Sequence, residues 1–149
     1  MDALDIDLVL VPVDGSEEST TAVEYAAAVA EKYDASVHAV YVLGENVVRA
    51  IETGAVAESE VAEETGAFNE TAQELAEAKG VPLSTSTARG FSTKTKLLHP
   101  GSVVLDTAEE VEADFIVVPR EPVSGDPGEV LEKAAEYVLL YASQPVLSV

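Results

Sequence analysis

Two hydrophobic patterns alternate along the chain, and they predict alternating strands and helices. Short apolar runs such as residues 8–11 and 115–118 are continuous, which is typical of strands that helices cover on both faces. Between these runs, longer segments repeat apolar residues every three or four positions, as amphipathic helices do. We predict strands at 6–13, 36–43, 81–87, 115–119 and 145–149, and helices at 18–33, 58–79, 102–112 and 129–141.

This alternation predicts an α/β fold made of one domain over residues 1–149. The expected architecture is an open, doubly wound, mostly parallel five-stranded sheet of order 3-2-1-4-5, with helices on both faces. Residues 44–57 and 89–101 are interpreted as the two long connections. In this fold a ligand crevice lies at the carboxyl ends of the strands, where the strand order reverses. We therefore expect it between the first and fourth strands.

Composition narrows the possible functions. The chain has 149 residues, 28 acidic against 8 basic side chains, a formal charge of −20 and no cysteine. Disulfides, thiolate metal sites and cysteine nucleophiles are therefore excluded. Nucleic acid is not an expected partner, because its binding depends on Lys and Arg. No apolar run approaches a membrane span and the N-terminus is acidic, so we expect no membrane association and a cytoplasmic location.

The negative charge has two interpretations and one local exception. The first is an acidic surface suited to a salty cytoplasm, where salt screens the repulsion between carboxylates. The second is a surface that binds calcium or a cationic partner, although no Asp-x-Asp-x-Asp-Gly calcium loop is present. Residues 78–105 differ, with Lys79, Arg89, Lys94, Lys96 and no acid. The lysines of this basic window could dock on an acidic surface of this subunit or a neighbouring one. Alternatively, with Arg89, they could receive an anionic ligand or phosphorylated partner.

The segment that follows the first strand, residues 14–19, is the main candidate site. Its glycine and polar oxygens suit a tight turn that caps the next helix. In a second interpretation, Asp14 holds a ligand hydroxyl or ring nitrogen in the crevice. Glu17 and Glu18 would repel a phosphate there.

Other candidate residues have ordinary structural interpretations. His38 fits a histidine packed within a strand, and His99 precedes a Pro-Gly turn. The acidic residues between 109 and 114 are expected on a solvated helix face rather than at a metal. No Ser-His-Asp arrangement, His-Glu-x-x-His motif or phosphate-binding G-x-x-x-x-G-K-[ST] loop is present. We therefore predict that the protein is not an enzyme.

Three segments, residues 9–19, 113–118 and 144–149, resemble the opening, fourth-strand and closing segments of the universal stress protein family. One branch of that family binds ATP through G-x2-G-x9-G-(S/T). An ungapped alignment places the four motif residues on Pro119, Pro122, Glu132 and Lys133. Proline offers no N–H to a phosphate and Glu132 adds a like charge. We therefore expect no ATP in the usual manner and no cofactor.

The resemblance also supports an alternative function. Pro12, Asp14 and Val42 match positions that surround adenosine in the ATP-binding relatives. A modified pocket between the first and fourth strands, with Asp14 and Arg89 or Arg120, would then make the protein a nucleotide or small-anion sensor.

The family resemblance implies a homodimer, formed through the last strand. An apolar strand at a sheet edge invites further pairing, which a twofold axis would close. The residues predicted at this edge are Pro145, Val146, Leu147, Ser148 and Val149. We thus expect a non-enzymatic protein that acts through homodimerisation and an unknown protein partner.

Overall fold

The computed structural model describes residues 5–43, 45–89, 100–119 and 129–149. Its five strands form one parallel sheet of order β3-β2-β1-β4-β5, which confirms the predicted fold class and strand order. The strands are β1 (Leu8–Val13), β2 (Ser36–Leu43), β3 (Leu83–Arg89), β4 (Phe115–Val118) and β5 (Val146–Ser148). The helices are α1 (Glu17–Tyr33), α2 (Glu45–Thr53), α3 (Glu58–Glu77), α4 (Pro100–Glu110) and α5 (Glu129–Tyr141).

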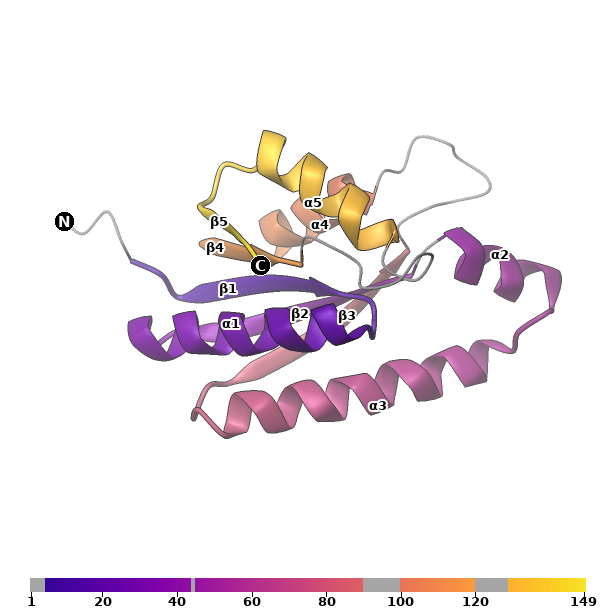
Figure 1. Cartoon of the computed structure of the whole chain (residues 1–149), viewed down its shortest axis with the longest axis horizontal. Helices are drawn as coiled ribbons and strands as arrows, with labels where there is room; N and C mark the ends of the chain where they lie inside the picture. Colours follow the sequence, from indigo (N-terminus) through magenta and orange to yellow (C-terminus); the bar gives the residue numbers. More distant parts are fainter. Residues whose placement is uncertain (1–4, 44, 90–99, 120–128) are drawn as a thin grey trace.

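Helices cover both faces of the sheet (Figure 1), so the central strands are apolar on both sides. Val9, Val11 and Val13 of β1 pack in one core with α1 and α3. Leu10, between them in the sequence, packs in the second core with α4, α5 and Ile116 of β4. Because successive strand residues point to opposite faces, this division explains the continuous apolar runs.

Three helices end in the same tight turn. Asp34, Gly80 and Glu112 follow α1, α3 and α4 with φ of 56°, 68° and 56°. In each turn the next residue donates its N–H to a carbonyl five residues earlier, at 2.8 to 2.9 Å. This is the Schellman arrangement, which favours glycine in the left-handed position. Each turn leads within a few residues into a strand.

The predicted connection at 44–57 is wrong in one respect, because it contains α2. This helix has only nine residues and lies beside the sheet rather than over it (Figure 1). Smaller differences concern boundaries: β1 begins two residues later than predicted, β3 is shifted to Leu83–Arg89, and α4 begins at Pro100.

Two backbone N–H groups at the start of β1, those of Asp7 and Leu8, donate to Asp114 Oδ2 at 2.9 and 3.1 Å.

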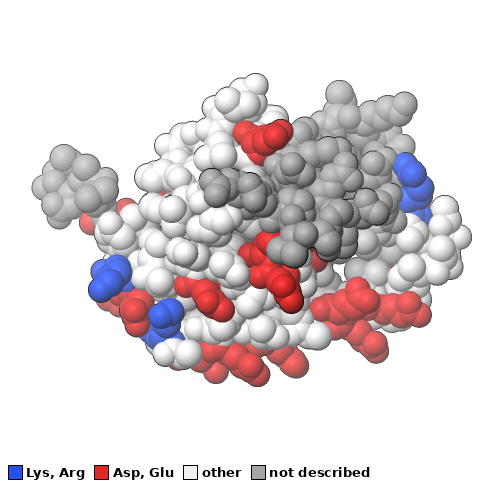
Figure 2. Space-filling model, viewed as in Figure 1, with Lys and Arg blue, Asp and Glu red and all other residues white. Residues whose placement is uncertain are grey.

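The acidic residues gather on the outer surface. Figure 2 shows many of them over the side formed by α1 and α3. The first turns of both helices are acidic, with Glu17, Glu18, Glu58 and Glu60. Of the helices described, none combines the length and apolarity needed to cross a bilayer.

Candidate functional site

The candidate site lies where the strand order reverses. From β1 the chain crosses to β2 on one side, whereas β4 pairs with β1 on the other. In doubly wound sheets a ligand crevice opens beyond the carboxyl ends of the strands at this point. Asp14 follows β1 and Pro119 follows β4, and Pro119 is buried. The structure therefore places Asp14 where the sequence predicted the crevice.

A network of short hydrogen bonds holds the turn after β1. Asp14 Oδ1 accepts from the Ser16 N–H at 3.0 Å and from the Ser19 hydroxyl at 2.8 Å. The Asp14 N–H donates to Ser19 Oγ at 2.8 Å. Ser16 is the N-cap of α1, with its side chain accepting from the Ser19 N–H at 3.3 Å. Ser16 therefore caps α1, and one oxygen of Asp14 stabilises the turn that leads into the cap.

The second oxygen of Asp14 has a different environment. Oδ2 is shielded from solvent and accepts no hydrogen bond from any residue in the described ranges. A buried polar atom without a partner costs about 1–3 kcal/mol, and more when it is charged. Among the described residues, the hydrogen-bonding capacity of this oxygen is therefore unused.

Tyr41 of β2 supports the same turn from the neighbouring strand. Its hydroxyl donates to the Asp14 carbonyl oxygen at 3.1 Å, and its ring packs edge-on against Phe68 at 6.0 Å between centroids. Burial raises the pKa of the Tyr41 phenol, and the carboxylates of Asp14 and Glu64 raise it further. The phenol therefore remains a neutral hydrogen-bond donor at neutral pH.

Gly15 is required at its position by Tyr41 and by the backbone. Its φ is +86°, and a Cβ there would lie 2.5 Å from the Tyr41 hydroxyl oxygen. The sequence analysis did not identify Tyr41 as part of the site. The available signal was a phenol within an otherwise apolar strand, because a buried tyrosine hydroxyl normally needs a partner.

The remaining predicted pocket residues are brought together only in part. Pro12 and Val42 are buried near the carboxyl ends of adjacent strands, and Val42 packs in the core beneath α4 and α5. Arg89 ends β3 opposite Leu43 in the register, and only its backbone is described. Arg120, Lys94 and Lys96 lie outside the described residues, as does His99.

The other residues weighed as ligands have structural roles. His38 is buried, and its ring nitrogens lie 2.7 Å from Ser84 Oγ and 2.8 Å from Ser86 Oγ, so it is a packed strand histidine as predicted. Burial lowers its pKa. Asp114 binds the backbone at the start of β1, as described above. Within the part of the chain described, no three His, Asp or Glu side chains form a possible metal site.

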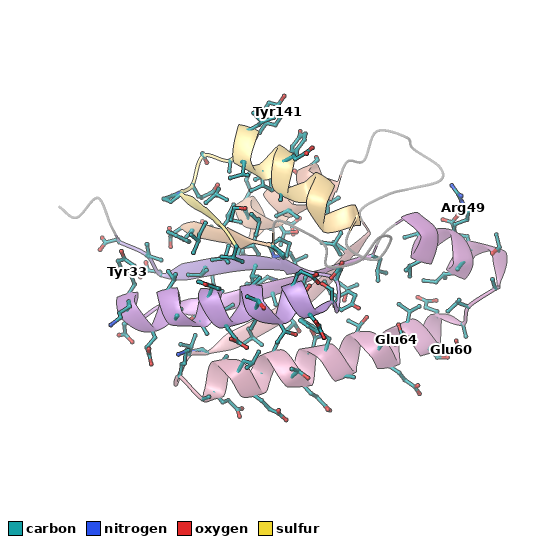
Figure 3. All side chains as sticks on the ribbon, in the orientation of Figure 1. Tyr33, Arg49, Glu60, Glu64 and Tyr141 are labelled. Atoms are coloured by element: carbon teal, nitrogen blue, oxygen red, sulfur yellow. The ribbon has the colours of Figure 1, made fainter. Side chains whose placement is uncertain are left out.

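The C-terminal edge forms a second candidate surface. Strand β5 pairs only with β4 and lies at the edge of the sheet. Beside it, Leu139, Leu140 and Tyr141 at the end of α5 are 52%, 75% and 65% exposed. Tyr141 projects from the outer end of α5, away from the sheet (Figure 3). Exposed apolar side chains therefore end the helix that precedes the edge strand.

The family model described as the universal stress protein family matches residues 6–149. The chain belongs to the universal stress protein family. A curated family member, universal stress protein MJ0531 of Methanocaldococcus jannaschii, is 29% identical over 144 residues, which cover 95% of this chain and 80% of that protein.

Solved structures of other universal stress proteins share the fold. One in complex with cAMP has a TM-score of 0.67 and 22% identity, and the match covers 97% of each chain. Another, from Archaeoglobus fulgidus in complex with dAMP, has a TM-score of 0.63 and 21% identity, with 96% of each chain covered. At these identities the likeness concerns the fold.

The positions aligned with the family's glycine loop are described in part. Pro119 is buried directly after β4, and Pro122 lies outside the described residues. Glu132 and Lys133 belong to α5, of which only the backbone is described at these positions.

Proposed function

We propose that this protein acts as a non-enzymatic universal-stress-type protein of the cytosol, through a homodimer formed by its C-terminal edge. It works by protein association and does not hold ATP through a glycine loop. The dimer presents a paired surface to a protein partner.

The observation that carries this proposal is an uncharged surface on a highly charged chain. Residues 137–149 contain no charged side chain, although the chain has 36 acidic and basic residues among 149. They form the end of α5 and the whole of β5. This segment combines the exposed Leu139 and Leu140 with the open strand edge.

Electrostatics favours this surface for self-association. Two copies that each carry −20 repel one another, and close like charges cost about 1 kcal/mol at 4 Å even in water. A twofold interface apposes the same patch on both copies. The uncharged segment reduces this repulsion, with Asp106 and Glu109 of α4 as the nearby charges, and pairing two β5 edges would also satisfy their free backbone groups.

Sedimentation of a charged variant tests the dimer. We expect the wild-type chain to sediment as a dimer at micromolar concentration in 1 M KCl, and Leu140→Glu to sediment as a monomer. Tyr25→Glu is the matched control, because Tyr25 is 50% exposed on α1, outside the uncharged segment at 137–149. Circular dichroism checks that both variants fold. A monomeric wild type, or equal weakening by both variants, would reject the proposal.

Pro119 supports the lack of a glycine-loop ATP site. A phosphate cradle requires backbone N–H groups that converge on the anion. Proline has no N–H and a fixed φ, so the first position of the loop donates nothing.

A second candidate function is binding of an adenosine-type ligand beside Asp14. The buried Asp14 Oδ2, which has no donor among the described residues, favours it. So do the relatives solved with cAMP and dAMP, although their ligands are known only for those proteins.

Calorimetry with ATP, AMP and cAMP tests this candidate. Binding of AMP or cAMP that Asp14→Asn removes and Glu17→Gln preserves would support it. Low-micromolar ATP binding that Asp14→Asn removes would contradict the first proposal, in which the protein does not hold ATP in the usual manner of the family. Lack of heat with all three ligands at millimolar concentration would reject the second candidate.

A further inference from the structure

A cavity of about 240 Å³ lies between α4 and the end of α5, away from the turn at Asp14. Residues 142–144, which join α5 to the start of β5, form part of its wall. Asp14, in contrast, follows the end of β1. Because the strands are parallel, all strands start at one end of the sheet and finish at the opposite end. The cavity is therefore separate from the candidate nucleotide site.

Two tyrosines on successive turns of α5 line this cavity. The rings of Tyr137 and Tyr141 lie 4.7 Å apart between centroids and are tilted by 47°. Tyr137 packs closely against α4, because Gly101 has no side chain; a Cβ added at Gly101 would collide with the Cβ of Tyr137. Tyr141 is 65% exposed, so a ligand can reach its ring.

The electrostatics of the cavity favours a positive charge. Asp106 and Glu109 of α4 contribute two carboxylates to the lining, and none of the described lining residues is basic. The last turn of α5 also carries no basic residue, so nothing there offsets the negative end of the helix dipole. Aromatic faces attract cations as well, especially quaternary ammonium groups.

The size of the cavity limits the ligand. Pockets for drug-sized ligands measure about 300–1,000 Å³, whereas this one is about 240 Å³. A nucleotide is too large and carries the wrong charge for these walls. We propose that the cavity binds a small organic cation with an ammonium head, which contacts the tyrosine rings and the carboxylates of Asp106 and Glu109.

Binding is tested with choline chloride by NMR titration of the ¹⁵N-labelled protein at constant chloride concentration. We expect saturable shifts of the amide signals of Asp106, Ser143 and Gln144. The neutral isostere 3,3-dimethylbutan-1-ol has the same shape without the charge, and we expect it to produce no saturable shift. Equal binding of both compounds would show that the cavity selects shape alone and would overturn the proposal.

Matched variants measure separately how much the Tyr141 ring and the carboxylates contribute to choline binding. Tyr141→Leu should raise the choline Kd roughly two- to five-fold, as expected for an exposed cation–π contact, and Tyr141→Phe should leave it near the wild-type value. Glu109→Gln should raise the Kd, whereas Glu110→Gln, on the same helix outside the cavity lining, should not. An equal effect of both glutamine variants would overturn the proposal.

A second copy of the chain is the competing occupant, because the cavity adjoins the uncharged segment at 137–149. Titration at two protein concentrations, below and above the dimerisation range, distinguishes the two. Retained binding in the dimer supports the ligand site. Loss of binding as the dimer forms would show that the second copy fills the cavity, and the proposal would be wrong.

Discussion

Replacing Gly15 by alanine should destabilise the protein through two separate costs. The first is conformational, because Gly15 has a φ of +86° and a left-handed backbone costs about 1–2 kcal/mol for a residue with a Cβ. The second is steric, because the new Cβ would lie 2.5 Å from the Tyr41 hydroxyl oxygen. Tyr41 must then move and lose its hydrogen bond to Asp14, worth about 0.5–1.5 kcal/mol.

The expected loss in the free energy of unfolding is therefore about 1.5–3.5 kcal/mol for Gly15→Ala. Gly80→Ala is the matched control, since its φ is +68° and nothing lies within 4 Å of an added Cβ. That variant should lose only the conformational part, about 1–2 kcal/mol. Urea unfolding followed by circular dichroism at constant KCl measures both values.

A double-mutant cycle isolates the contact with Tyr41. In Tyr41→Phe the hydroxyl is gone, and the nearest remaining ring atom lies 3.4 Å from the Cβ position. Gly15→Ala should then cost about 1 kcal/mol less in the Tyr41→Phe background than in the wild type. An identical cost in both backgrounds, or a Gly15→Ala loss no larger than that of Gly80→Ala, would refute the reasoning.

Three further predictions concern stability. Glu112→Gly should raise the free energy of unfolding by up to about 1 kcal/mol, because Glu112 is left-handed at φ 56°; urea midpoints of the two proteins test this, and an unchanged or lower value contradicts it. His38 has a lowered pKa in the folded chain, so its contribution to the free energy of unfolding is present above the unfolded pKa of 6.5 and is lost as the pH falls below it. The decline in the free energy of unfolding between pH 7 and pH 5 should therefore be smaller in His38→Gln than in His99→Gln. Adding KCl from 0.1 to 1 M should raise the urea midpoint, because the screening length falls from about 10 to 3 Å; a falling midpoint would show that repulsion among the acidic residues is not the dominant effect.

The fold was predictable because its main signals are local. Residues 8–11 and 115–118 are short, uninterrupted apolar runs, as expected for strands buried on both faces. Helix α2 was missed because it has only nine residues, within a segment interpreted as a connection. Its apolar residues Val47, Val48 and Ile51 do have helical spacing, so the local pattern held the signal.

The candidate site was predictable only in part, because its geometry is not local. Asp14 stands out in the sequence as a polar residue directly after a strand. That one of its oxygens caps the turn while the other is buried without a described donor depends on Ser19 and on the packing around them. The role of Tyr41 depends on the register of β2 against β1, where it lies opposite Val13. No short-range pattern encodes that pairing.

The tight turns at Asp34, Gly80 and Glu112 have a consequence for engineering. They close one end of the sheet, where helices return to strands and the carbonyl contacts allow no additional residue. At the opposite end, the chain uses 10 residues, 90–99, between β3 and α4 and 10 residues, 119–128, between β4 and α5. Grafted loops, reporter tags or new termini should therefore be accepted in these two connections and rejected at the three tight turns, which gives this chain two separate positions for engineering.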